Sequence, residues 1–162
     1  MNILIYGTEN SGNLGSIIRT SVVFGLKRLY LFDQFELLKN DSALDRANEV
    51  SLGHIKEIEI IPVENPVLFV REYPHAFATT LAKGSKRIGD PDFDIKFLLD
   101  VLILFGNETT GLPRELSRSH NIQKIVVPTK GMDYCLSLPV AFGIVLYDYL
   151  KQHPEEFPQR GK

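Results

Sequence analysis

Strand-like and helix-like segments alternate along nearly the whole of this 162-residue chain. The apolar patterns predict strands at residues 2–6, 28–32, 57–61, 75–79, 101–105 and 124–127. Helical spacing, bounded by prolines and glycines, predicts helices at residues 16–24, 43–49, 66–72, 114–119 and 138–152. This alternation is typical of an α/β fold with a mostly parallel sheet flanked by helices. We expect one domain over residues 1–153 and a C-terminal tail at residues 154–162.

The segment at residues 102–112 joins a strand to a loop bounded by glycines. Its apolar run ends at Gly106, a polar turn containing Glu108 follows, and Gly111 closes the turn. Proteins of the α/β class build ligand sites where a parallel strand ends in such a loop. Backbone amides of this turn could read the edge of an adenine-like ring, and Glu108 could order the loop. A tight turn with Glu108 in water is the structural alternative.

A loop rich in glycine and asparagine is predicted at residues 11–15, after the first strand. Gly12 and Gly15 would allow close backbone approach, and the N-terminus of the helix at residues 16–24 would attract an anion. Arg19 would then lie one turn into the helix and could reach back over the loop to a phosphate or carboxylate. An amphipathic helix with a surface arginine accounts for the same residues.

A third segment, residues 125–141, places a strand, a loop and a helix in succession. Pro128 ends the strand, Gly131 lies in the loop, and Ser137 is a natural N-cap for the helix. Pro139 falls in the first helical turn, where its missing N–H costs little. Taken alone, this is a well-formed junction and nothing more.

Together the three segments resemble the SpoU-type RNA ribose 2′-O-methyltransferases of the SPOUT superfamily. That family's pattern Asn-x-Gly-x-x-x-Arg is matched in full by Asn13, Gly15 and Arg19. Its pattern Gly-x-Glu-x-x-Gly-Leu is matched by Gly106, Glu108, Gly111 and Leu112. Its pattern Pro-x-x-Gly-x-x-x-Ser-Leu-Asn-Val-Ser-Val-Ala is matched by Pro128, Gly131, Leu136, Val140 and Ala141. The resemblance covers nearly the whole chain, and three patterns in order are far more specific than one.

The third segment departs from the family pattern at three positions. Cys135 stands where the family usually has serine, Ser137 at the usual asparagine and Pro139 at the second usual serine. Because Cys135 and Ser137 remain small and polar, the resemblance still implies cofactor binding. The missing amide at Ser137 bears on substrate choice and on turnover.

The resemblance implies an enzyme that methylates a ribose 2′-hydroxyl of tRNA or rRNA, with tRNA favoured, and that uses S-adenosylmethionine as its cofactor. It also implies a C-terminal segment threaded into a deep trefoil knot, which general rules of topology would not propose. The cofactor-binding residues implied by the resemblance are Thr79, Leu104, Gly106, Asn107, Gly111, Val126, Val127, Met132, Cys135 and Leu136.

The implied chemistry is an in-line displacement at a sulfonium methyl group. The enzyme has to supply proximity, orientation and a proton acceptor. The family assigns activation of the hydroxyl to the position of Arg19. Because an arginine stays protonated and is a poor base, we expect Arg19 to position phosphate and to stabilise the developing alkoxide. Asn13 and Glu108 would hold the surrounding loops, and Ser137 would help to order the catalytic loop and the substrate ribose.

Charge limits how RNA could be held. The formal net charge is −2 and the sequence pI is about 6.1, so composition does not support nucleic-acid binding and any contact needs local patches. The candidate RNA-binding residues, drawn from both subunits, are Arg19, Lys83, Lys86, Arg87, Arg114 and Lys130. The helix at residues 138–152 is apolar around most of its circumference, which predicts a core or an interface. Since the family's site forms between two subunits, we expect a homodimer through this C-terminal helix.

Other features of the chain narrow its setting. One cysteine, Cys135, suits a reducing cytoplasm, and no signal peptide or membrane-spanning run is visible, so we expect a cytoplasmic protein without membrane contact. The four histidines share no metal-ligand spacing, and we expect no metal. The competing function is a non-catalytic dimer of the same fold that binds S-adenosylmethionine, RNA or both, and the changes at residues 135–139 motivate it. A flavodoxin-like nucleotide-binding domain would explain the alternation but none of the motifs.

Overall fold

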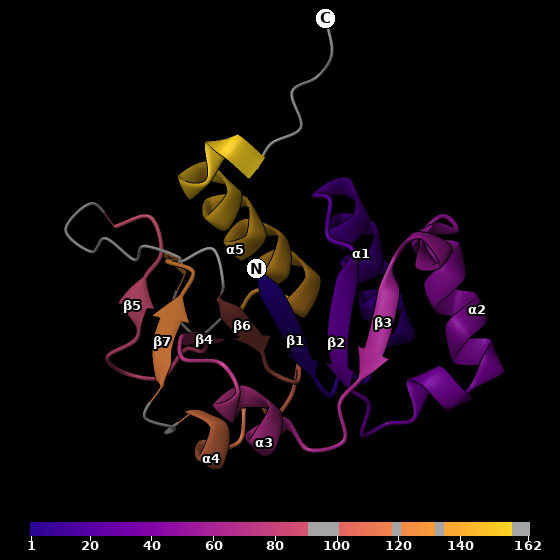
Figure 1. The fold of residues 1–162 in the computed structure, drawn as a ribbon, viewed down its shortest axis with the longest axis horizontal. Helices are drawn as coiled ribbons and strands as arrows, with labels where there is room; N and C mark the ends of the chain where they lie inside the picture. Colours follow the sequence, from indigo (N-terminus) through magenta and orange to yellow (C-terminus); the bar gives the residue numbers. More distant parts are fainter. Residues whose placement is uncertain (91–100, 118–120, 132–134, 157–162) are drawn as a thin grey trace, which may run out of the picture.

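A computed structural model describes residues 1–90, 101–117, 121–131 and 135–156 of the chain. Within these residues, seven strands form one sheet in the order β3-β2-β1-β6-β4-β7-β5, and each pair of neighbours is parallel (Figure 1). The strands are β1 (Asn2–Tyr6), β2 (Arg28–Phe32), β3 (Glu59–Pro62), β4 (Ala76–Thr79), β5 (Lys86–Arg87), β6 (Leu102–Phe105) and β7 (Ile122–Val126). The predicted α/β fold with a parallel sheet is therefore confirmed.

The helices cover both faces of the sheet (Figure 1). They are α1 (Ser11–Val23), α2 (Asp41–Val50), α3 (Pro66–Arg71), α4 (Arg114–Ser117) and α5 (Leu138–Gln152), with short 3-10 turns η1 (Leu37–Lys39), η2 (His54–Glu57) and η3 (Pro154–Glu156). Because successive strand residues point to opposite faces, Ile3 and Ile5 pack into the core under α1 and α5, while Leu4 packs into the core beside α3 and α4. Among the described residues, no helix is long and apolar enough to cross a membrane.

Most predicted boundaries agree with the structure within two residues, and β1, β2 and α5 agree at both ends. No strand was predicted at residues 86–87, but Lys86 and Arg87 form β5, a short edge strand paired with β7. Of the predicted tail, residues 154–156 form η3, and the remainder lies outside the described residues.

The predicted loop at residues 11–15 is wrong, because α1 already begins at Ser11. Asn10 is the N-cap, and its Oδ1 accepts a hydrogen bond from the Asn13 backbone N–H at 3.1 Å. Asparagine is a favoured N-cap because its side chain satisfies one of the free amides of the first turn. Gly12 and Gly15 are typical of a loop, but the helix begins ahead of both of them. As a result, Arg19 lies about two turns into the helix rather than one.

Gly15 serves the packing of two helices rather than the approach of a ligand. A Cβ at Gly15 would lie 2.6 Å from the backbone oxygen of Ala47 and 2.8 Å from the Cβ of Val50, both in α2. The α1 and α2 backbones therefore approach each other at a point where no side chain fits.

We expect Gly15→Ala to lower the free energy of unfolding by about 1–3 kcal/mol, because the α2 backbone has to move away from the new methyl group. Gly143→Ala in α5 is the matched control, since a Cβ there would lie 3.8 Å from Thr20 Cγ2, an ordinary contact. Alanine's higher helix propensity should leave that variant unchanged or up to about 1 kcal/mol more stable. Urea denaturation measures both changes, and equal stability of the two variants would contradict the packing role of Gly15.

The strand order places several turns at one edge of the sheet. β1 pairs with β2 on one side and with β6 on the other, so successive strands are added on one side of β1 at first and on its other side later. Ligands of open parallel sheets bind beside the carboxyl ends of the strands near such a switch. The segments that follow β1, β6, β4 and β7 meet at this edge, and the start of α5 lies against it.

Candidate functional site

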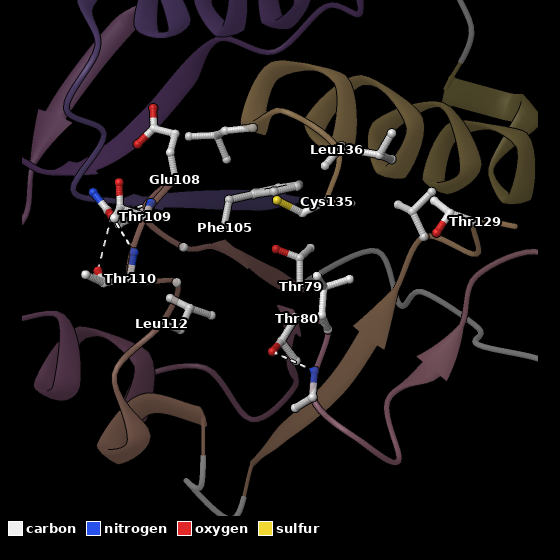
Figure 2. Close-up of a pocket in the computed structure, with 18 residues that line it drawn as sticks. Thr79, Thr80, Phe105, Glu108, Thr109, Thr110, Leu112, Thr129, Cys135 and Leu136 are labelled. Carbon is white, nitrogen blue, oxygen red and sulfur yellow. Dashed lines mark hydrogen bonds between the residues drawn. The ribbon is translucent and has the colours of Figure 1, made fainter. Parts of the chain in front are cut away.

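A cavity of about 450 Å³ lies where β4, β6 and β7 end (Figure 2). Figure 2 shows Thr79 and Thr80 from the end of β4, Glu108, Thr109 and Thr110 from the turn after β6, and Cys135 and Leu136 ahead of α5, all arranged around it. The volume falls in the range of small-molecule sites. The position is the one that the sheet topology favours for a ligand.

Most of the predicted cofactor-binding residues line this cavity. Those that do are Thr79, Gly106, Asn107, Gly111, Val127, Cys135 and Leu136, and Glu108 joins them. Leu104 and Val126 do not. Leu104 is fully buried in the core beside α3 and α4, and the next residue, Phe105, lines the cavity instead. Met132 lies outside the described residues.

Sequence reasoning missed part of the lining. The additional residues are Thr80, Leu81, Ala82, Phe105, Thr109, Thr110, Leu112, Thr129, Leu138 and Ala141. Position after a strand could have identified some of these residues. The residues directly after a parallel strand lie at the carboxyl edge of the sheet, and Thr80 directly follows β4. For Phe105, the alternation of side chains along β6 decides which face it joins.

Asn107 ties the turn after β6 to the loop after β1. Its side chain is buried, and its Nδ2 donates to the backbone oxygen of Gly7 and to Glu9 Oε1, the latter at 3.0 Å. Gly7 has a φ of 64°, a left-handed conformation that favours glycine. The amide side chain of Asn107 therefore acts between two loops of the protein, although the residue lines the cavity.

The turn after β6 is closed by its own hydrogen bonds. Asn107 Oδ1 accepts the backbone N–H groups of Thr109 at 2.8 Å and Thr110 at 2.9 Å. Asn107 and Gly111 exchange backbone hydrogen bonds of 3.1 and 3.0 Å. These four amides already have partners within the protein, so they are not the groups that would read an adenine-like ring. The turn therefore forms one wall of the cavity, and its shape is fixed by hydrogen bonds within the protein.

Gly106 makes this closed turn possible. A Cβ at Gly106 would lie 2.5 Å from the carbonyl carbon of Gly111 and 2.7 Å from the backbone nitrogen of Leu112. Because Gly106 has no side chain, the backbone of Gly111 and Leu112 can pack directly against it.

Glu108 joins two of the sequence motifs directly. Its Oε1 accepts hydrogen bonds from Asn13 Nδ2 at 2.8 Å and from the hydroxyl of Thr8 at 2.5 Å. Its Oε2 accepts the backbone N–H of Glu9 at 3.3 Å. Hydrogen bonds to a carboxylate are stronger than those between neutral groups, so this cluster fixes the start of α1 against the turn after β6.

Of the four predicted catalytic residues, Glu108 lines the cavity, whereas Asn13, Arg19 and Ser137 do not. Arg19 is exposed on α1. Ser137 is exposed and occupies the N-cap position of α5, but its side chain makes no capping hydrogen bond. Its neighbours Leu136 and Leu138 both line the cavity. The structure therefore unites Asn13 with Glu108 and leaves Arg19 and Ser137 apart from them.

The predicted RNA-binding residues fall into two groups. Lys83, Lys86 and Arg87 follow the lining segment that ends at Ala82, and Lys130 follows the lining residue Thr129. Arg114 opens α4 two residues after the lining residue Leu112, whereas Arg19 lies on α1, which contributes no lining residue. All of these cations are exposed except Lys86, which is half-buried.

Comparison with known proteins gives consistent matches. The family model described as the SpoU rRNA Methylase family matches residues 1–147. The tRNA (guanosine(18)-2′-O)-methyltransferase of Aquifex aeolicus is 30% identical over 153 residues, which cover 91% of this chain and 67% of the relative.

Two solved structures are similar over most of the chain. An AdoMet-bound rRNA methyltransferase from Sinorhizobium meliloti has a TM-score of 0.74 and 27% identity, covering 93% of this chain and 55% of the other. This chain therefore spans only about half the length of that relative. A structure described for the 2-OH methylation of C/U34 on tRNA has a TM-score of 0.78 and 25% identity, covering 95% of this chain and 96% of the other.

Proposed function

This chain belongs to the SpoU rRNA methylase family, and we propose that it transfers the methyl group of S-adenosylmethionine to a ribose 2′-hydroxyl of RNA, with tRNA as its substrate. The observation that carries the proposal is the contact between Asn13 and Glu108 at the edge of the cavity. Residues 95 positions apart in the chain meet beside a space suited to a small molecule.

The cavity fits S-adenosylmethionine in size and in character. Small-molecule sites combine apolar walls with a few fixed polar groups. Here Leu112, Val127 and Leu138 supply apolar surface, and Thr80 and Thr129 supply hydroxyl groups. Bound there, S-adenosylmethionine supplies an activated methyl group on a sulfonium. These residues, with the backbone beside them, would hold it against the preformed turn after β6.

The chain's own contribution is orientation and electrostatics. Glu108 is bound by Thr8, Asn13 and the Glu9 amide, so it acts as an organiser of the loops rather than as a free base. The guanidinium of Arg19 positions an RNA phosphate and stabilises the negative charge that develops on the ribose oxygen. We propose that Ser137, whose side chain makes no capping hydrogen bond, contacts the ribose.

We propose that two copies of the chain form the complete site. Val140, Ile144 and Tyr147 are 48%, 38% and 56% exposed, and their spacing places them along one side of α5. The opposite side of α5 is buried in the core. Arg19 lies outside the cavity lining of its own chain, and α1, which carries it, packs against α5. A dimer through α5 would bring Arg19 of the partner subunit toward the cavity.

Sedimentation equilibrium tests the dimer. At micromolar concentration we expect twice the 18.3 kDa mass of the chain. Ile144→Glu should shift the equilibrium to the monomer, because it places a charge in an apolar interface. Glu49→Gln on α2, where Glu49 is exposed and pairs with Arg46, is a control that should remain dimeric. A wild-type monomer would contradict the proposal.

The trefoil knot is also a proposal. What supports it is the strand order, in which β6 enters between β1 and β4 although β5, earlier in the chain, forms the sheet edge. The family's C-terminal segment is threaded in this part of the fold.

The proposed preference for tRNA is supported by likeness to two relatives and by local charge. The relatives are the tRNA (guanosine(18)-2′-O)-methyltransferase of Aquifex aeolicus and the structure described for the 2-OH methylation of C/U34 on tRNA. Lys83, Arg87 and Lys130 continue from segments that line the cavity, so an RNA backbone beside the cavity would meet cations.

A transfer assay tests the function. Incubation with methyl-labelled S-adenosylmethionine and either bulk tRNA or rRNA should label tRNA, and mass spectrometry of the digested RNA should identify a 2′-O-methyl nucleoside. Label in rRNA alone would contradict the tRNA preference. Calorimetric binding of S-adenosylmethionine without transfer to either RNA would support a non-catalytic binding protein instead, as the changes at Cys135, Ser137 and Pro139 allow.

Cys135 provides an independent test of the cofactor site. It is the single cysteine of the chain, it is exposed, and it lines the cavity (Figure 2). We expect saturating S-adenosylmethionine to slow alkylation of Cys135 by iodoacetamide about tenfold or more, because at ten times Kd about nine-tenths of the sites are covered. Methionine at the same concentration is the control. An unchanged rate would place the cofactor elsewhere.

An exposed thiol also suits the reducing cytoplasm, where we propose that the protein acts.

A further inference from the structure

Thr8 is a buried polar residue that none of the sequence motifs contains. It follows β1 and Gly7, and it is only 1% exposed. Gly7 leads the chain into this position, since its φ is 64° and its N–H donates to the Phe32 backbone oxygen at 3.0 Å. Thr8 is thus held in place by the end of β1 and by its neighbour β2.

The hydroxyl of Thr8 acts on the same atom as Asn13. Thr8 Oγ1 donates to Glu108 Oε1 at 2.5 Å, and Asn13 Nδ2 donates to that oxygen at 2.8 Å. The Glu9 backbone N–H reaches the other oxygen at 3.3 Å. Two donors on one carboxylate oxygen and a third on the other leave the carboxylate little freedom to rotate.

We propose that Thr8 is a positioning residue for methyl transfer, because its hydroxyl holds the Glu108 carboxylate in the orientation that anchors Asn13 beside the cavity. This inference rests on the proposed function. Glu108 lines the cavity and Asn13 lies in the first turn of α1, so the contact fixes the start of α1 against the cofactor wall. The same helix carries Arg19, which in the proposed dimer faces the cavity of the other subunit. Thr8 is only 1% exposed, so removing its hydroxyl takes a hydrogen-bond donor from Glu108 at a point that solvent does not reach in the wild-type protein.

Three variants separate positioning from general stability. Thr8→Val replaces the hydroxyl by a methyl group of similar size, and Thr8→Ser keeps the hydroxyl while removing the methyl. Ser51→Ala is the matched control: Ser51 is fully buried outside the cavity lining, and its hydroxyl donates to the Asn48 backbone oxygen at 3.0 Å. Each variant is measured for Tm, for the Kd of S-adenosylmethionine and for kcat with tRNA, all relative to the wild type.

The expected result is a selective loss of turnover. Thr8→Val should lower kcat about tenfold to a hundredfold, the effect of a small misplacement at a reacting centre, while the Kd of S-adenosylmethionine stays within about twofold. Thr8→Ser should recover most of kcat, and Ser51→Ala should lower Tm without lowering kcat.

Other outcomes would overturn the inference. Wild-type kcat in Thr8→Val would show that the hydroxyl is dispensable. A loss of S-adenosylmethionine affinity equal to the loss of kcat/KM, a Thr8→Val chain that does not fold, or no recovery in Thr8→Ser would show a structural role. If the wild-type protein transfers no methyl group to RNA, the proposed function fails as well, so the wild-type assay distinguishes the two failures.

Discussion

Arg19→Ala is expected to slow methyl transfer about 10²–10³-fold, because it removes the cation that faces the charge developing on the ribose oxygen. Arg19 is exposed and lies outside the cavity lining, so the Kd of S-adenosylmethionine should stay within about twofold of wild type. An exposed side chain contributes little to folding, and the free energy of unfolding should change by less than about 0.5 kcal/mol. Single-turnover transfer to tRNA, with calorimetry for the cofactor, measures both effects.

Two further variants sharpen this result. Arg19→Lys keeps the charge but loses the planar fork that binds phosphate with two hydrogen bonds, so it should recover only part of the rate. Arg46→Ala is the control, since Arg46 is an exposed arginine of α2 that pairs with Glu49. Transfer by Arg19→Ala at more than about a third of the wild-type rate would assign the chemistry to another residue.

Gly106→Ala is expected to weaken S-adenosylmethionine binding about 30-fold and to abolish detectable transfer at low cofactor concentration. The new Cβ would meet backbone atoms at 2.5 and 2.7 Å, which cannot move unless the turn opens. Opening the turn breaks the two backbone hydrogen bonds between Asn107 and Gly111. At about 1 kcal/mol for each hydrogen bond, losing both costs about 2 kcal/mol, which corresponds to an increase in Kd of about 30-fold.

Gly143→Ala is the matched control for the cofactor wall, because this glycine lies outside the cavity lining and a Cβ there has room. Its affinity for S-adenosylmethionine should equal that of the wild type in calorimetry. Wild-type affinity in Gly106→Ala would mean that the turn after β6 does not form the cofactor wall.

The sequence predicted the secondary structure well where local patterns carry the information. The strands β1 and β2 and the helix α5 have the predicted bounds, because their apolar spacing and flanking residues act within a few positions of the chain. Prediction failed at the start of α1, where Gly12 and Gly15 resemble a loop. Gly15 is needed because α1 contacts α2 there, about thirty residues later in the chain. The spacing of residues along α1 does not predict this contact.

The sequence predicted the residues of the candidate site where a local motif identified them and missed those that depend on distant contacts. The three motifs located the turn after β6 and the loop before α5, and most of the residues they imply line the cavity. Leu104 is among the cofactor-binding residues that the family resemblance implies, whereas the pleat of β6 turns it into the opposite core. Thr8 carried no signal at all, since its role depends on a carboxylate 100 positions away.

By itself, the sequence determined the α/β class, the parallel sheet, the bounds of α5 and the family, because periodicity and short motifs are written in neighbouring residues. The tertiary structure alone decided that Asn13, Thr8 and Glu108 form one cluster and that Gly15 and Gly106 admit backbone rather than ligand. It also decided that Arg19 stands outside the cavity lining of its own chain. These facts depend on strand order and on the approach of distant backbones, which no local pattern specifies.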